Sequence, residues 1–63
     1  MKVRFHAQRW FNDHAIEVDP EGETVFEVGD HYKVSDSLRY HCNAPQWVQD
    51  WPGPGCFEAL SDD

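Results

Sequence analysis

Long hydrophobic runs are absent from this sequence, in which apolar residues never stand more than two in a row. A transmembrane helix needs about 20 consecutive apolar residues, so the sequence does not predict a membrane-spanning protein. The first residues, Met1 to His6, alternate apolar with basic side chains and contain no apolar signal region. We therefore expect a cytoplasmic protein that binds no membrane.

Cysteine is also scarce, with Cys42 and Cys56 as the two examples. Because thiols stay reduced in the cytoplasm, we expect both to be free and buried like small apolar side chains. A disulfide between them remains the alternative. The cysteines form no Cys-x-x-Cys motif, and the histidines have no zinc-ligand spacing (His6, His14, His31 and His41). We expect neither a metal nor another cofactor, with a metal-stabilised mini-domain as an open alternative.

Positively charged residues are also scarce. The sequence has 5 Lys and Arg residues against 12 Asp and Glu residues, which gives a formal net charge of −7. Residues 13–30 contain no Lys or Arg but carry a run of acids (Asp13, Glu17, Asp19, Glu21, Glu23, Glu27 and Asp30). Such a surface repels nucleic acid, which proteins bind largely through Lys and Arg contacts to phosphate. The natural complement is a basic protein surface.

The chain is short, and its 63 residues are enough for one domain, residues 1–63. So small a domain has little room for a deep pocket of the kind that encloses a small-molecule substrate. The sequence also contains no nucleophile elbow, phosphate-binding loop or His-Glu-x-x-His motif. His41 and Cys42 are adjacent, but a catalytic nucleophile and base must meet through space. We therefore expect a protein that is not an enzyme.

Alternation of apolar and polar residues predicts strands near residues 2–10, 15–19 and 24–28. Turns are expected at Asn12-Asp13 and at Pro20-Glu21-Gly22, so that the three strands form an antiparallel meander. In this register Gln8 faces Glu17 and Ile16 faces Phe26. One face of the sheet then buries the apolar side chains of all three strands (Val3, Phe5, Ala7, Ile16, Val18, Phe26 and Val28).

The second half of the chain predicts two short helices and a last strand. Ser35 is expected to cap a helix from Asp36 to about Cys42, and Asn43 to end it. A second helix over residues 44–51, capped by Asn43, would place Trp47, Val48 and Trp51 on one face. A strand near 56–60 would pair with the first strand, ahead of a frayed tail at 61–63. The predicted fold class is α+β: a small three- to four-stranded antiparallel sheet with one or two short helices packed on one face.

The predicted binding site is the acidic outer face of the 15–28 hairpin (Glu17, Asp19, Glu21, Glu23 and Glu27). Successive residues on one face of a strand are about 6–7 Å apart, which is comparable to the spacing of phosphates along a nucleic-acid strand. Trp10, at the open end of this face, is the first candidate for an aromatic anchor, and Trp47 or Trp51 comes next. The alternative is an ordinary solvated face, partly neutralised by Lys2, Arg4 and His6.

Two segments, Trp10 to Gly22 and Asn43 to Val48, resemble small acidic proteins encoded by tailed bacteriophages and prophages. This resemblance implies a protein that binds a host protein and blocks or redirects it, in the host cytoplasm. The predicted function is binding of a basic protein surface, including inhibition of a nucleic-acid-binding protein by mimicry of nucleic acid. The alternative is a structural or accessory module.

Overall fold

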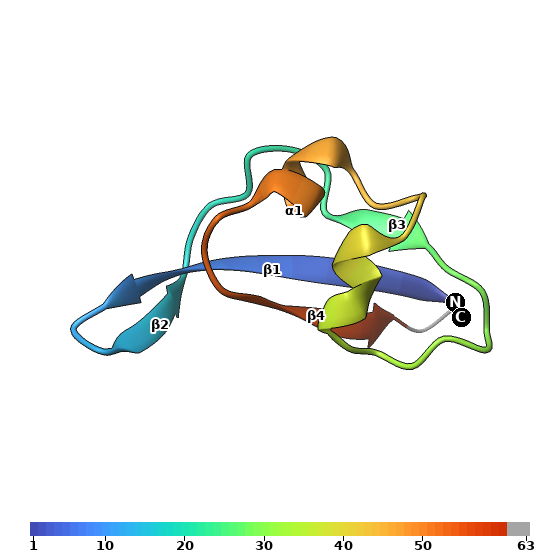
Figure 1. Ribbon diagram of the computed structural model, residues 1–63, viewed down its shortest axis with the longest axis horizontal. Coiled ribbons are helices and arrows are strands. Elements are labelled where there is room, and N and C mark those ends of the chain that lie inside the picture. Colours follow the sequence, from blue (N-terminus) through green and yellow to red (C-terminus); the bar gives the residue numbers. More distant parts are fainter. Residues whose placement is uncertain (61–63) are drawn as a thin grey trace.

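The computed structural model describes residues 1–60 and has the predicted α+β architecture (Figure 1). Four strands form an antiparallel sheet: β1 (Lys2–Phe11), β2 (His14–Glu17), β3 (Val25–Glu27) and β4 (Gly55–Leu60). A 3-10 helix, η1 (Asp36–Tyr40), and an α-helix, α1 (Gln46–Asp50), pack on one face of it. Within residues 1–60, no helix is long and apolar enough to cross a membrane.

Strand β1 is the centre of the sheet, because each of the other three strands pairs with it. Odd-numbered residues of β1 bond to one side, where Phe5 N–H donates to Thr24 O and Ala7 O accepts from Val18 N–H. Even-numbered residues bond to the other side, where Gln8 N–H donates to Pro54 O. Strands β2 and β3 therefore follow one another along one edge of β1, and β4 occupies the opposite edge.

This topology corrects the predicted meander. The first hairpin is confirmed: Gln8 faces Glu17, and the turn residues Asn12 and Asp13 adopt φ values of 49° and 70°. The second hairpin is wrong, because β3 pairs with β1 instead of β2, and Phe26 faces Val3 rather than Ile16. Residues 18–24 connect β2 to β3 without pairing the two strands. Strand β4 pairs with β1, as predicted.

The core lies between the sheet and the two helices. It contains five of the predicted residues (Val3, Phe5, Ala7, Phe26 and Val28) and the apolar residues of the second half (Leu38, Ala44, Val48, Trp51 and Phe57). Two predictions were wrong: Ile16 is 42% exposed, and Val18 is only partly buried against the core. Ile16 belongs to β2, which lies in the part of the sheet that extends past the helices (Figure 1), whereas Val18 directly follows β2.

Gly55 allows the closest approach of β4 to this core. It faces Ala7 across the sheet, and a Cβ atom there would lie 2.6 Å from Cζ of Phe5 and 3.0 Å from the carbonyl oxygen of His6. A side chain at this position would force the Phe5 ring or the backbone to move, so glycine is required for the packing.

The helical segments form where they were expected but are shorter and are capped differently. Ser35 makes no capping bond, because its Oγ bonds Oγ of Ser37, and η1 ends at Tyr40 before Cys42. The residue before α1 is Pro45 rather than Asn43, whose side-chain amide instead donates to the carbonyl of Glu27 at 2.9 Å. The Asn43 side chain therefore ties the loop before α1 to β3. The predicted tail at 61–63 lies outside the described residues.

Candidate binding surface

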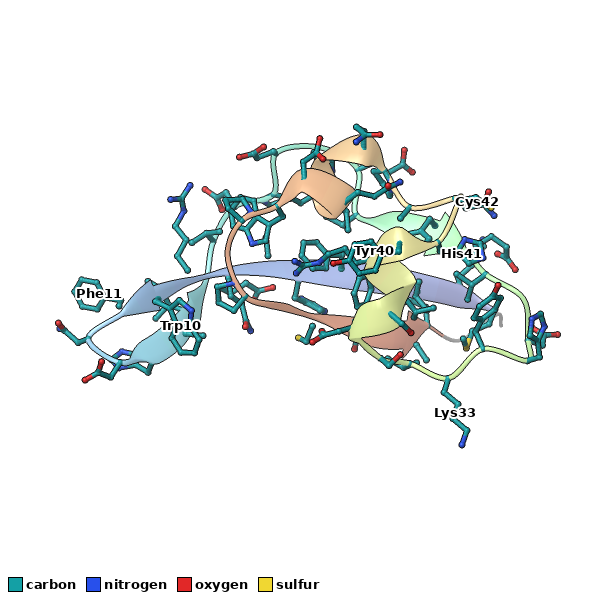
Figure 2. All side chains as sticks on the ribbon, viewed as in Figure 1. Trp10, Phe11, Lys33, Tyr40, His41 and Cys42 are labelled. Atoms are coloured by element: carbon teal, nitrogen blue, oxygen red, sulfur yellow. The ribbon has the colours of Figure 1, made fainter. Side chains whose placement is uncertain are left out.

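The most prominent feature of the surface is a two-stranded arm that extends beyond the helices at one end of the molecule (Figures 1 and 2). The arm consists of residues 8–11 of β1, the turn Asn12-Asp13 and β2. It lies at one end of β1, the longest strand of a molecule whose longest dimension is 36 Å. A two-stranded hairpin has marginal stability by itself. The base of this arm is held by two backbone bonds, from Val18 N–H to Ala7 O and from Gln8 N–H to Pro54 O.

Three large apolar side chains of the arm are exposed to solvent: Trp10 by 69%, Phe11 by 58% and Ile16 by 42%. Side chains of paired residues share a face, so Phe11 and Ile16 lie on one face of the arm and Trp10 on the other. Trp10 also borders an open depression of about 260 Å³ that is lined by Trp51, Arg9 and residues 52–54. Aromatic residues exposed in this way are typical of interface anchors.

The other two candidate anchors, Trp47 and Trp51, have structural roles. Trp51 is 5% exposed, and its indole N–H points at the carbonyls of Gln8 and Pro54, at 3.2 and 3.1 Å. Trp47 is partly buried and donates to the carbonyl of Glu23 at 2.9 Å, so it fixes residues 18–24 against α1. Both indoles hold loops in place, and neither side chain is exposed in the way that was expected of a candidate anchor.

Sequence reasoning missed Phe11 and Tyr40 as exposed aromatic side chains. Tyr40 is 78% exposed at the end of η1, outside the arm (Figure 2). The signal for Phe11 is its position directly before the Asn12-Asp13 turn, which puts it at the tip of the arm and beyond the reach of the core. The predicted helix over 36–42 gave no comparable indication that the Tyr40 side chain is exposed.

The five acidic residues of the predicted site are all exposed but do not form one row. Glu17 lies in β2 and Glu27 in β3, while Asp19, Glu21 and Glu23 lie in the connection between them. Glu17 faces Gln8 and Glu27 faces Lys2, at positions of β1 six residues, or about 20 Å, apart. The regular carboxylate spacing expected for a paired 15–28 hairpin is therefore wrong.

Two acidic side chains, one of them in the predicted site, bind the imidazole of His6. Glu17 Oε1 lies 2.6 Å from Nδ1 of His6, and Glu58 Oε1 lies 3.0 Å from Nε2 of the same ring. Both ring nitrogens can donate only in the protonated imidazolium. The hydrogen bond to Glu17, and then the one to Glu58, raises the pKa of His6 above its ordinary value of 6.5, against a smaller opposing effect of burial.

The His6 contacts predict a pH-dependent stability. The raised pKa of folded His6 means that its contribution is complete below about pH 6.5, where the unfolded chain is protonated too, and is lost as the pH rises through the folded pKa. We therefore expect the free energy of unfolding to fall across this window, as measured by urea denaturation at a series of pH values. His6→Gln should abolish this part of the pH dependence, and His31→Gln, which removes an exposed loop imidazole, should retain it. An unchanged slope in His6→Gln would contradict the assignment.

Glu27 belongs to a separate cluster at the other end of β1. The Met1 ammonium donates to Glu27 Oε1 at 2.9 Å, to Asp30 Oδ1 at 2.8 Å and to the carbonyl of Val28 at 2.9 Å. The hydrogen bonds to Asp30 and Glu27 raise the pKa of this amino group to about 10, and the same ammonium lowers the pKa of Asp30. The contacts fix the start of β1 beside the end of β3.

Three acids of the predicted site have no such partner in the part of the chain that the structure describes. The ion pairs formed within residues 1–60 involve Glu17, Glu27, Asp30 and Glu58, but none of Asp19, Glu21 or Glu23. We call residues 19–23 the acidic connection. It lies beside α1, where Trp47 packs against Gly22.

The cysteines are free and exposed rather than buried, which corrects the prediction of buried thiols. Among residues 1–60, no three His, Cys, Asp or Glu side chains are grouped so that they could hold a metal ion. Cys42 Sγ does approach Nδ1 of the neighbouring His41, at 4.0 Å. That nitrogen already accepts a hydrogen bond from Asn43 N–H at 3.0 Å, so its lone pair is not available to deprotonate the thiol.

Comparison with protein-family models, with curated proteins and with solved structures finds no match for this chain.

Proposed function

We propose that this protein is a non-enzymatic binding protein that engages a basic surface of another protein in the cytoplasm of a bacterial host. The observation that carries the proposal is the acidic connection, where Asp19, Glu21 and Glu23 are exposed without an ion pair to any residue from 1 to 60. Exposed charge of one sign steers a partner of the opposite sign and raises the rate of association.

The arm supplies the apolar part of the proposed interface. Trp10 and Phe11 are exposed on opposite faces of a hairpin that stands away from the core. Glu17 is the last residue of the arm, two residues before the acidic connection begins. Protein interfaces combine a few aromatic anchors with a polar or charged rim. A nucleic-acid-binding protein is one partner with the required basic surface, but the irregular placement of the acids favours recognition by charge over imitation of a phosphate row.

A structural or accessory role is the second candidate. It is favoured by Glu17 and Glu27, whose carboxylates neutralise His6 and the Met1 ammonium within the molecule. Under this alternative the acidic residues stabilise the fold and keep the surface solvated, and no partner depends on them.

The two candidates differ in the expected effect of removing charge. Asp19→Asn with Glu21→Gln should slow association with the partner several-fold and leave the melting temperature unchanged, since these side chains form no ion pair within residues 1–60. The assay is capture from a bacterial lysate on the immobilised protein, followed by kinetic measurement with the recovered partner at low and high salt. Exposed charges are screened beyond about 8 Å at physiological ionic strength, so binding should weaken as salt increases.

The matched control removes the same charge elsewhere. Asp36→Asn with Asp50→Asn changes two exposed acids of η1 and α1, outside the acidic connection. Association that slows equally in both variants would indicate a general effect of net charge. Association that changes in neither, at any salt concentration, would leave only the structural role.

A further inference from the structure

The outer edge of β2 is an unpaired edge of the sheet. Strand β2 pairs with β1 on one side, through the backbone groups of His14 and Ile16, while those of Ala15 and Glu17 point away from β1. No backbone group of residues 1–60 bonds the amides of Ala15 and Glu17 on this side. An edge of this kind is a template for another strand.

The opposite edge of the sheet differs from this one. The outer edge of β4 also presents outward amides, at Phe57 and Ala59, but Phe57 is only 9% exposed because its side chain is packed in the core. A strand added beside β4 would therefore gain new side-chain contacts mainly on one face. A strand added beside β2 would meet exposed side chains on both faces of the arm.

The side chains that border the β2 edge define what such a strand would carry. One face presents Ile16 and His14, which pair with Arg9 and Phe11 of β1, and the other face presents Glu17. Asp13 precedes β2 and Asp19 follows it, so acids stand at both ends of the strand. Because side chains of a strand alternate between faces, a complementary segment carries Lys or Arg at every second position and apolar residues between them.

Charge also decides between this occupant and a second copy of the chain. An antiparallel pairing of two β2 strands about Ile16 would bring Asp13 of one copy opposite Asp19 of the other, on molecules that each carry a net charge of −7. Like charges placed opposite one another destabilise strand pairing. A cationic segment would instead be attracted by Asp13 and Asp19, the residues that repel each other when two copies pair.

We propose that an extended segment of the partner, in which cationic and apolar residues alternate, adds to the sheet as a strand along the outer edge of β2. This inference rests on the proposed function and deepens it by naming the part of the partner that is recognised. The backbone amides of Ala15 and Glu17 provide the hydrogen bonds, Glu17 and the flanking aspartates select the cations, and Ile16 and Phe11 receive the apolar side chains.

The test uses a capped peptide of alternating Lys and Val as the probe and follows amide hydrogen exchange by NMR. Saturating peptide should slow exchange of the Ala15 and Glu17 amides at least tenfold and leave those of Phe57 and Ala59 unchanged. A peptide of the same charge with Pro in place of the central Val residues should give no protection, because Pro lacks the N–H that pairing requires. Equal effects of the two peptides, or no protection at Ala15 and Glu17, would overturn the proposal.

A pair of variants tests the same edge in the full chain. Ala15→Pro removes an outward N–H without removing a bond to β1, and Ala59→Pro does the same on β4. Ala15→Pro should reduce affinity for the Lys-Val peptide at least tenfold, while Ala59→Pro should not. Slow exchange at Ala15 and Glu17 that depends on protein concentration without peptide would instead identify a second copy as the occupant and overturn the proposal. If the wild-type protein captures no partner in a charge-dependent way, the proposed function itself is contradicted. If it captures such a partner and Ala15→Pro does not weaken the capture, only strand addition is contradicted.

Discussion

Phe5→Ala is expected to leave the protein largely unfolded at 25 °C. Phe5 is 1% exposed, and its ring packs against Phe57 and Trp47, with centroid separations of 5.0 and 5.7 Å. Deleting a buried phenyl ring costs about 3–5 kcal/mol. A core in a domain of this size supplies about 3–5 kcal/mol of net stability, so the loss is comparable to the whole. Far-UV circular dichroism and thermal melting measure the effect.

Phe11→Ala is the matched control, because it removes the same side chain from the same strand. Phe11 is 58% exposed at the tip of the arm, so its loss should change the free energy of unfolding by less than about 0.5 kcal/mol. A similar loss of stability in both variants would mean that the Phe11 side chain is buried in the protein, in contradiction to the exposed arm of this structure. A cooperative melt of Phe5→Ala near the wild-type temperature would show that the core is not where the structure places it.

Trp10→Ala is expected to speed dissociation from a basic partner about 30-fold while the melting temperature stays the same. Truncation of an aromatic anchor typically costs about 2 kcal/mol or more of binding free energy, and such losses occur mostly in the dissociation rate. Trp10 lies on the face of the arm that also carries Glu17, so the anchor and the nearest acid would meet the partner together. Surface plasmon resonance with the captured partner separates the two rates.

Tyr40→Ala supplies the comparison for Trp10→Ala. Tyr40 is the more exposed side chain, at 78%, but it lies in η1, away from the arm. If the arm is the interface, Tyr40→Ala should leave both rate constants unchanged. If Tyr40→Ala speeds dissociation and Trp10→Ala does not, the interface lies on the face formed by η1, and the arm has another role.

The first hairpin and the burial of β1 could be predicted from the sequence because their signals are local. Alternation from Lys2 to Gln8 identifies the buried side of β1, and Asn12-Asp13 tolerates the positive φ values that the tight turn requires. The pair Trp47 and Val48 shows helical spacing with Trp51, and this face of α1 is indeed turned toward the core. None of these inferences depends on pairing between strands that are distant in the sequence.

The position of β3 could not be predicted in this way. Strands 15–19 and 24–28 are separated by a strong turn signal, Asp19-Pro20-Glu21-Gly22, so pairing them satisfied every local rule. In the structure, β1 has ten residues and is long enough to pair with β2 and β3 in succession along one edge. The local pattern of residues 15–28 is the same in both arrangements, which differ in whether β3 pairs with β2 or with the start of β1, far away in the sequence.

The misplacement of β3 carried over to the predicted site. If β2 and β3 paired, Glu17 and Glu27 would share one acidic face, whereas in the structure each has a separate partner, the His6 imidazole or the Met1 ammonium. The excess of negative charge is a property of composition and was therefore visible in the sequence. The division of that charge between internal ion pairs and the acidic connection depends on tertiary structure.

The dependence of every strand on β1 also sets the order in which the chain can fold as it is synthesised. β1 is made before the other three strands, yet Lys2 pairs with Leu60, so its hydrogen bonds to β4 have to wait until residue 60 has been made. The β1–β2 hairpin needs only a short loop and can close within about 1–10 μs. Until β4 is made, the growing chain therefore carries a hairpin with an unpaired edge and exposed aromatic residues, the kind of surface on which chains aggregate. Its negative charge, already present in residues 13–30 at that stage, would keep such nascent chains apart.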